Sequence, residues 1–483
     1  MAAHSLPKSL TDLPLLRHAG QTLTDQLAER FAARIRDQLL PPGARLPSVR
    51  QCAAQQGLSP STVVAAYEQL LAQGLVKAEQ GRGFFVRAQA GKRTRADPPS
   101  PVRMSAPIHA TALIRGMFAP AGAQPQPGLG TLPADWLQTP FLGAALRRVS
   151  TPQCLGELAF VYGEPQGDGQ LRRVLADRLQ DIGVPAEPGQ IITTVGATHA
   201  LDVISRTLLQ PGDAVLVEEP GWAVELARLS AMGMRILPVP RGVDGPDLTV
   251  MARLCQAHAP KLLVSVSVLH NPTGACLSPA RAHQVLQLAQ QHDFHIVEDD
   301  TYAHIAPEHV TRLSVLDGLQ RTIYVSGFSK ILAPGWRVGY MAVPQALRER
   351  LLDTRLLGTL TTPGLTERAM ALCVEQGQLR RHAQRVRERL DAARARSVKL
   401  AQAHDCPFMA EPAGLFGWVD TGVDTEALAQ HMLDAQILLA PGALFYAVRA
   451  PSTLMRINFA TTQHAGFWRQ LVRARQVLRR AGA

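Results

Sequence analysis

The chain has 483 residues, of which 46% are hydrophobic and 18% charged, so it is long enough for two or three globular domains. Its longest apolar runs, such as residues 262–269, have the length of a strand and exclude a membrane-spanning helix. The net charge of +11 permits a polyanionic partner without establishing one. Six scattered cysteines without a CxxC pair argue against a metal site or a disulfide framework, and no signal peptide is evident, which together predict a cytoplasmic protein.

Two helices are predicted near the N-terminus. Residues 22–39 place an apolar residue at every fourth position, which predicts an amphipathic helix with one apolar stripe. Ser48 can cap a second helix over residues 49–56, and Gly57 suits the position just beyond its end.

A third helix and a hairpin follow. Ser59 can cap this helix, with Pro60 at its first position. Residues 75–86 alternate about a Gly-Arg-Gly turn and predict a two-stranded wing. Two short helices joined by a tight turn and followed by a wing predict a winged helix-turn-helix domain.

Residues 45–86 resemble the winged-helix domain of the GntR family of bacterial regulators, and we expect this domain to span residues 18–88. The resemblance implies DNA-binding roles for Arg45 and Arg50 at phosphates, for Ser59, Ser61 and Thr62 at the start of the recognition helix, and for Gly81, Arg82 and Gly83 at the minor groove. Pro60 and Val64 stand where some relatives place base-reading arginines, so the bases read do not carry over. A helical bundle that touches no DNA is the alternative.

Residues 89–118 are rich in proline, alanine and basic residues and have no sustained period, which predicts a linker. Its basic residues leave nonspecific DNA contacts open, although a solvated tether is the simpler interpretation.

In residues 119–483, apolar runs of strand length alternate with helical stretches, which predicts a parallel sheet wrapped by helices. The predicted strands are residues 191–195, 213–219, 261–269, 295–299 and 322–327. Ligands bind at the carboxyl ends of such strands, so the residues that follow each run are the candidates for a site.

Small residues and an aromatic residue follow the first two of these strands. The backbone N–H groups of Gly196, Ala197 and Thr198 can hold a phosphate at a helix N-terminus, although many such turns are merely turns. Trp222 offers a flat stacking surface, or is simply a core residue.

Polar residues follow the next three strands. Asn271 comes after residues 261–269, and residues 298–302 contain three carboxylates followed by Tyr302. At least one of these carboxylates needs a cationic partner if it is buried. Lys330 follows the last strand, and Arg337 lies seven residues further on.

Together these residue types suit pyridoxal 5′-phosphate (PLP). Lys330 supplies the amine for a Schiff base, Asp299 a carboxylate for the ring nitrogen, and Trp222 a stacking surface. Asn271 and Tyr302 suit the ring oxygen, and the turn at residues 196–198 with Arg337 suits the phosphate. Burial and Arg337 are expected to lower the pKa of Lys330.

This order resembles the fold-type I aminotransferases of classes I and II over residues 120–480, which implies a mainly parallel sheet and a smaller C-terminal α/β subdomain. The resemblance implies that Tyr162 reaches the phosphate of a partner subunit and that Arg456 clamps a substrate carboxylate. Relatives often have Ser or Thr where this chain has Gly327, so Ser326 or Ser329 can serve the phosphate instead. The choice of Asp299 over Asp300 rests on the spacing to Tyr302.

The whole chain resembles the MocR-type subfamily of GntR regulators, in which a winged helix precedes an aminotransferase-like domain. The resemblance implies a cytoplasmic homodimer that binds a double-stranded DNA operator. Its effector would be PLP itself or an amino compound that replaces the Lys330 link. The alternative is an active aminotransferase of an α-amino acid that carries a DNA-binding head, because Lys330 can act as the base once released. A pocket that no longer binds the cofactor is a third possibility.

Overall fold

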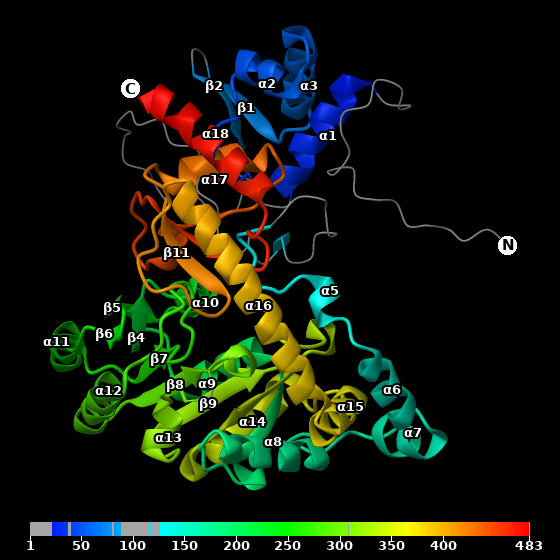
Figure 1. The fold of residues 1–483 in the computed structure, drawn as a ribbon, viewed down its shortest axis with the longest axis vertical. Coiled ribbons are helices and arrows are strands. Elements are labelled where there is room, and N and C mark those ends of the chain that lie inside the picture. The colour runs from blue at the N-terminus through cyan, green and yellow to red at the C-terminus, as the bar shows by residue number, and fades with distance from the viewer. Residues whose placement is uncertain are drawn as a thin grey trace.

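The computed structural model describes residues 22–36, 40–79, 82–87, 115–116, 126–307 and 309–482. Figure 1 shows three parts, namely an N-terminal head, a C-terminal subdomain beside it, and a large domain at the other end. Gly81 and most of the predicted linker lie outside the described residues.

The head is the predicted winged helix. Its elements are α1 (Leu23–Arg36), α2 (Val49–Gln56), α3 (Pro60–Ala72), β1 (Val76–Glu79) and β2 (Gly83–Val86). Ser48 forms a capping box with Gln51, and Gly57 ends α2 with a φ of 64°, in the left-handed region that glycine favours. The Ser59 hydroxyl accepts from the Thr62 N–H at the start of α3. The predicted caps are therefore confirmed.

The core of the head is apolar and closed. Leu27, Val63, Tyr67 and Leu70 are fully buried, and Phe31 stacks edge-on against Tyr67. The Tyr67 hydroxyl donates to the carbonyl of Pro47 (2.9 Å), so this buried hydroxyl is satisfied.

The large domain contains an eight-stranded sheet in the order β3-β10-β9-β8-β7-β4-β5-β6. The strands are β3 (Ile191–Val195), β4 (Ala214–Glu219), β5 (Arg235–Gly242), β6 (Gly245–Pro246), β7 (Leu262–Ser265), β8 (His295–Asp299), β9 (Thr322–Gly327) and β10 (Val338–Ala342). The helices of this domain are α5 (Ala134–Leu137), α6 (Pro140–Val149), α7 (Pro152–Leu158), α8 (Gly169–Asp181), α9 (Ala197–Leu208), α10 (Ala223–Ala231), α11 (Leu248–His258), α12 (Pro279–Gln291), α13 (Leu313–Asp317), α14 (Arg348–Thr359) and α15 (Gly364–Glu375).

The sheet is mainly parallel, as predicted. Strands β5, β4, β7, β8 and β9 pair in parallel, while β10 runs antiparallel between β9 and β3. Every residue of β9 is buried, as expected for a strand covered on both faces. The carboxyl ends of β3, β4, β7, β8 and β9 therefore meet along one edge.

One predicted strand is too long. Strand β7 ends at Ser265, although the apolar run continues to Leu269. The Val266 N–H donates to the Glu218 carboxylate (3.1 Å) and Leu269 has a φ of 50°, so this stretch leaves the sheet to form the floor of a pocket.

The C-terminal subdomain combines three strands with three helices. The antiparallel sheet has the order β11-β13-β12, formed by β11 (Phe416–Asp420), β13 (Leu454–Asn458) and β12 (Ala440–Pro441). Helix α16 (Gln378–Ala403) runs from the large domain to this subdomain, where α17 (Thr425–Leu433) and α18 (Ala465–Gly482) pack (Figure 1). No helix of the described part is long and apolar enough to cross a membrane.

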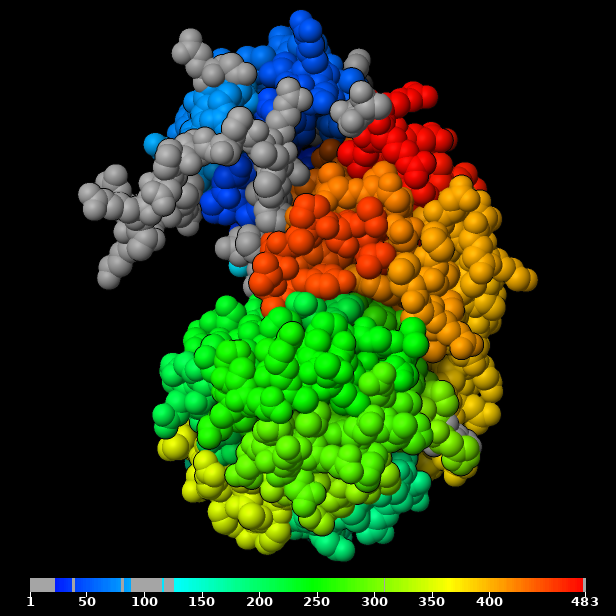
Figure 2. Space-filling view, turned by 90° about the vertical axis from the view of Figure 1, so that its left-hand side faces the viewer, coloured from blue at the N-terminus to red at the C-terminus, as the bar shows by residue number. Residues whose placement is uncertain are grey.

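The head rests on the C-terminal subdomain. An ion pair joins Arg34 Nη1 in α1 to Asp434 Oδ1, the residue just after α17 (3.1 Å). Figures 1 and 2 both show α18, in red, alongside the blue head.

Candidate functional site

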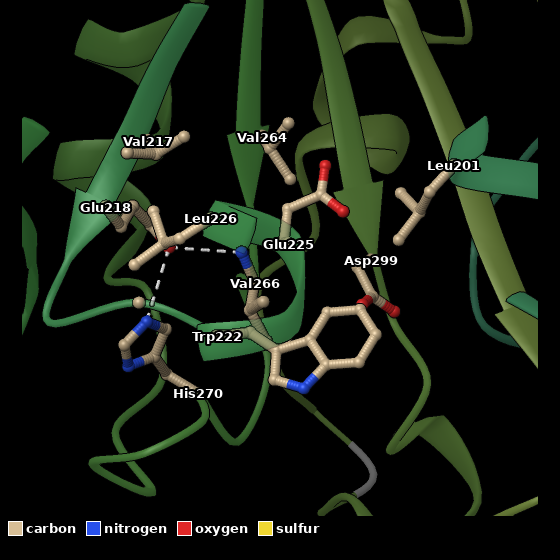
Figure 3. Close-up of a pocket in the computed structure, with 11 residues that line it drawn as sticks. Leu201, Val217, Glu218, Trp222, Glu225, Leu226, Val264, Val266, His270 and Asp299 are labelled. Atoms are coloured by element: carbon tan, nitrogen blue, oxygen red, sulfur yellow. Dashed lines mark hydrogen bonds and ion pairs between the residues drawn. The ribbon is translucent and has the colours of Figure 1, made fainter. Parts of the chain in front are cut away.

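The strand ends converge on a pocket in the large domain. Trp222 and Glu225 at the start of α10, His270 after β7, and Asp299 at the end of β8 line it. Figure 3 shows the Trp222 indole beside the Asp299 carboxylate, at the carboxyl ends of these parallel strands. The sequence predicted that Trp222 and Asp299 lie at one edge, and the structure brings them together.

Lys330 lies in the turn after β9. Burial, together with the positive charges of the Arg456 and Arg337 guanidinium groups, lowers the pKa of its ammonium to about 8, while the Asp299 carboxylate opposes this shift. A Cβ atom at Gly130 would lie 3.9 Å from both Lys330 Nζ and Arg456 Nη1, so these two nitrogens converge on one small space. Lys330 therefore loses its proton at a lower pH than an exposed lysine does.

The three carboxylates at the end of β8 have different surroundings. Glu298 accepts hydrogen bonds from the Leu313 and Ser314 N–H groups. Asp300 pairs with Arg312 Nε (2.6 Å). Arg312 is therefore the cationic partner that we expected for at least one of the three buried carboxylates.

Asp299 faces the pocket. Its pKa is raised to about 6, mainly by burial and also by the nearby Glu225 carboxylate, although hydrogen bonds from Thr301 oppose this shift. Asp299 has no ion-pair partner among the described residues, whereas Asp300 is bound elsewhere, so Asp299 is the carboxylate available to a cationic ring nitrogen.

The β3–α9 turn has a geometry that can hold an anion, and it is called the nest below. Gly196 has a φ of 81° and caps α9 without any side-chain hydrogen bond, so the first N–H groups of the helix, at Ala197 and Thr198, are left for a ligand. Arg337 lies against this turn and donates to the Val195 carbonyl (3.0 Å). Arg337 itself has a φ of 53°, an uncommon conformation for a residue other than glycine that clusters at functional sites.

There is little space for a side chain at Gly327, the position where a Ser or Thr was expected from the resemblance. A Cβ at Gly327 would lie 3.2 Å from the Val338 carbonyl oxygen, and a Cβ at Gly339 would lie 2.5 Å from the carbonyl carbon of Gly196. Ser326 is fully buried and donates to the Asp300 carbonyl (2.9 Å), so it faces away from the nest. Ser329 accepts from Arg337 Nη1 (3.3 Å) and is the hydroxyl next to the nest.

Arg456, on β13, is a buried cation without an anion. Its side chain is 4% exposed and lies over the Phe416 and Phe445 rings. Burial lowers its pKa to about 10. It donates to Asn271 Oδ1 (2.9 Å) and to the Gly128 carbonyl, forms no ion pair with any described residue, and leaves Nε without a partner. A planar, desolvated guanidinium in this state is suited to a carboxylate ligand.

Tyr302 and Asn271 lie on the same side as Arg456. Burial raises the pKa of the Tyr302 phenol, and a hydrogen bond between its side chain and that of Asn271 opposes this change. The Tyr302 ring also packs edge-on against Phe416 (5.5 Å between centroids). The phenol and the amide therefore lie side by side, next to Arg456.

Two features of the site had no signal in the sequence. Residues 128–131 form a strap over it, because Gly128 binds Arg456 and Asn458 Nδ2 donates to the carbonyls of Leu129 (3.0 Å) and Thr131 (2.7 Å). In the lining of the pocket, Glu218 is paired with Arg241 and accepts a hydrogen bond from Ser265 (3.0 Å). Only the tertiary fold brings these segments together.

Tyr162 lies away from this pocket. Its side chain is 79% exposed, and its neighbours Phe160 and Val161 are exposed as well. This single chain therefore does not bring Tyr162 to its own site, and the expected role of Tyr162 requires a partner subunit.

The predicted DNA-contacting residues of the head lie on its surface. Arg45, Arg50, Ser59 and Ser61 are exposed, and Thr62 is half-buried at the start of α3. Arg45 lies against the wing, since a Cβ at Gly83 would be 3.4 Å from Arg45 Nε. Arg82 is paired with Glu79 (2.6 Å) and lies over Phe85, so its charge is partly balanced.

Comparisons with known proteins agree with this two-part structure. The family model described as aminotransferase class I and II matches residues 145–468, and the model of bacterial regulatory proteins of the gntR family matches residues 23–86. The uncharacterized HTH-type transcriptional regulator YisV of Bacillus subtilis is 27% identical over 452 residues, which cover 91% of each chain. The similarly described YdcR of Escherichia coli is 28% identical and covers 90% of this chain and 94% of its own.

Solved structures match the large domain and the C-terminal subdomain. The α-aminoadipate aminotransferase LysN of Thermus thermophilus, complexed with N-(5′-phosphopyridoxyl)-L-leucine, superposes with a TM-score of 0.69 at 23% identity and covers 76% of this chain and 95% of its own. A multiple substrate aminotransferase from Thermococcus profundus gives 0.67 at 25% identity, over 74% and 92% of the two chains. The chain therefore belongs to the aminotransferase class I and II family, and its fused GntR head gives it the architecture of MocR-type regulators.

Proposed function

We propose that this chain is a transcriptional regulator that binds operator DNA with its head and senses PLP, or an amino compound, through Lys330 and Arg456. The observation that carries the proposal is the pair of converging nitrogens. One is a lysine amine with a pKa lowered to about 8, and the other belongs to a buried arginine with no anionic partner among the described residues.

The residues present fit PLP. When bound, PLP supplies an aldehyde that a primary amine can attack and a ring that withdraws electrons. Lys330 Nζ is the amine, Asp299 can hold the ring nitrogen protonated, and Trp222 can stack on the ring. Gly196, Ala197 and Thr198, together with Arg337 and Ser329, can bind the phosphate, and Asn271 with Tyr302 can bind the ring oxygen.

The second ligand is expected to carry a carboxylate next to its amine. Among the described residues, Arg456 donates only to uncharged oxygens, one on Asn271 and one on Gly128, and its Nε has no hydrogen-bond partner. A carboxylate is a stronger acceptor for a guanidinium than an amide oxygen is. The carboxylate of an α-amino acid would therefore replace the Gly128 carbonyl as the acceptor of the Arg456 hydrogen bond, while its amine would compete with Lys330 for the PLP aldehyde.

A continuous set of contacts connects Gly128 to the head. The Gly128 N–H donates to the Leu438 carbonyl (2.8 Å), and the Gln126 side chain bonds both the Leu438 N–H (3.0 Å) and the Gln436 carbonyl (2.9 Å). Asp434, two residues earlier, holds Arg34 of α1. A ligand that displaces Gly128 from Arg456 would therefore act on residues 434–438, which support the head. A regulator with two states needs a contact of this kind, which the ligand changes in one state and not in the other.

The remaining predictions belong to the same proposal. We infer a homodimer in the cytoplasm, in which Tyr162 of each chain reaches the phosphate site of the other, and an operator with repeated half-sites. The exposed apolar neighbours of Tyr162, namely Phe160 and Val161, support an interface at this position.

Amino transfer is the competing function, and the intact site supports it. Lys330 Nζ, once released, can move a proton at the substrate Cα because its pKa lies near neutrality. In that case the head would regulate the expression of an enzyme.

One experiment separates the two functions. DNA containing the gene's own upstream region is titrated with full-length protein, with and without PLP and a panel of L-amino acids, and the same panel is assayed for amino transfer. The proposal expects at least one compound to change DNA affinity. Turnover of a compound together with constant DNA affinity would refute it in favour of the enzyme.

A further inference from the structure

The net charge of the chain is concentrated in two helices. Helix α16 contains eight basic and two acidic residues, and α18 contains five basic residues and no acidic one. Their combined net charge of +11 equals that of the whole chain, so the other residues balance to zero. Helix α18 and the last turns of α16 lie in the C-terminal subdomain, where this excess of positive charge favours a surface for a polyanion.

Helix α18 presents its cations in a line. Arg469, Arg473 and Arg480 are exposed, with spacings of four and seven residues that place them on one helix face. None of the three forms an ion pair with any residue in the described part of the chain. The stripe is roughly 16 Å long, which is close to five base pairs of a duplex.

Helix α16 extends this surface. Arg396 and Lys399 are exposed on its last turns, and Arg396 donates to Gln463 (2.6 Å), just before α18. We name the residues Arg396, Lys399, Arg469, Arg473, Arg479 and Arg480 the basic surface. Its sequence and exposure resemble those of a phosphate-binding surface more than those of a solvated helix face, since no acidic residue alternates with the basic ones along α18.

The position of the basic surface favours DNA over other polyanions. The Arg34–Asp434 pair fixes the head beside α17, and α18 packs on α17 and lies alongside the head in both views (Figures 1 and 2). A duplex held by the head is therefore the nearest extended polyanion. We propose that the basic surface binds the phosphate backbone of the DNA that flanks the site read by the head.

This inference rests on the proposed function in that the head must deliver the DNA. The basic surface would lengthen the stretch of DNA that the protein contacts without reading bases, because arginines at phosphates position a duplex but carry no sequence information.

The test measures how DNA affinity depends on salt. Full-length protein and a triple variant, Arg469→Gln, Arg473→Gln and Arg480→Gln, are titrated with a labelled 40-bp duplex of mixed sequence at several salt concentrations. Each lost phosphate contact should reduce the slope of log K against log salt by about 0.9, so the triple variant should lose about 2.7.

A matched control makes the same charge change elsewhere. Arg380, Arg381 and Arg385 are exposed in the first half of α16, which lies toward the large domain. The variant in which all three are glutamine should keep the wild-type slope. If both triple variants lose the same slope, the effect is one of net charge and the inference is wrong.

Two further variants keep the outcome clear. If the triple variant unfolds, Arg473→Gln alone should still lose about 0.9 of the slope. An unchanged slope in the α18 variants beside a lower slope in Arg50→Ala would overturn the basic surface while leaving the head as a DNA-binding domain. Unchanged slopes in all of them would refute the proposed function as well. Loss of binding to phosphatidylserine vesicles with an unchanged DNA slope would assign the surface to lipid instead.

Discussion

Replacing Arg456 should separate ligand binding from folding. In the Arg456→Met variant the guanidinium is lost while most of the side-chain volume stays. A pKa lowered from the usual 12.5 to about 10 corresponds to about 3 kcal/mol against the buried charge, which the variant recovers. The Gly128 and Asn271 oxygens lose their donor, at about 1–3 kcal/mol each. These terms partly offset, so the free energy of unfolding should change by no more than about 3 kcal/mol.

Ligand binding should change far more. Removing one partner of a buried, hydrogen-bonded charge pair costs about 2–5 kcal/mol, which weakens a carboxylate ligand by roughly 30-fold to several thousand-fold. The assay titrates PLP-loaded protein with L-amino acids and follows cofactor absorbance, while denaturant unfolding measures stability.

Arg475→Met provides the matched control. Arg475 is equally buried, but it donates to the His404 (2.6 Å) and Asp405 (3.2 Å) carbonyls at the far side of the subdomain. This variant should be destabilised and should keep ligand affinity. If Arg456→Met binds amino acids as tightly as the wild type, Arg456 is not the carboxylate clamp.

Three other predictions follow from the geometry. Lys330→Ala should abolish the adduct that borohydride traps on the wild-type protein with PLP, and an adduct on the variant would place the reactive lysine elsewhere. On the wild type, the rate of adduct formation should rise with pH through about 8, because the Lys330 amine becomes neutral there and not at the usual 10.5. Arg50→Ala should weaken DNA binding and reduce the salt slope by about 0.9 while the protein stays yellow, whereas unchanged affinity would remove Arg50 from the contacts. The effect of ligand on DNA affinity should fall by a similar amount in Arg34→Ala, in Asp434→Ala and in the double variant, since each breaks the same ion pair. If the effects of the two single variants simply add in the double variant, the Arg34–Asp434 pair does not carry the signal to the head.

The sequence predicted features with a local signal. The caps at Ser48 and Ser59 and the strands at residues 191–195, 295–299 and 322–327 depend on residues a few positions apart, so periodicity and turn chemistry locate them. Parallel topology then placed Asn271, Asp299 and Lys330 at one edge. That reasoning needed no knowledge of side-chain contacts.

Other features depend on residues far apart in the chain. The contact of Gly128 with Arg456 spans 328 positions, and that of Arg34 with Asp434 spans 400. Nothing in either segment marks its partner. The early end of β7 likewise depends on Glu218, a residue of a neighbouring strand that binds the Val266 N–H. The sequence therefore predicted which residues gather at the strand ends but missed the strap at residues 128–131 and the contacts that support the head.

The central claim is that ligand binding at Lys330 and Arg456 is coupled to DNA binding by the head. The most direct test titrates PLP-loaded protein with its effector, followed by cofactor absorbance, in the presence and absence of the gene's own upstream DNA. Linkage requires DNA to change effector affinity by the same factor by which the effector changes DNA affinity, typically about 5-fold to 150-fold. We expect such a reciprocal shift, and identical effector affinities with and without DNA would show that the two sites are not coupled.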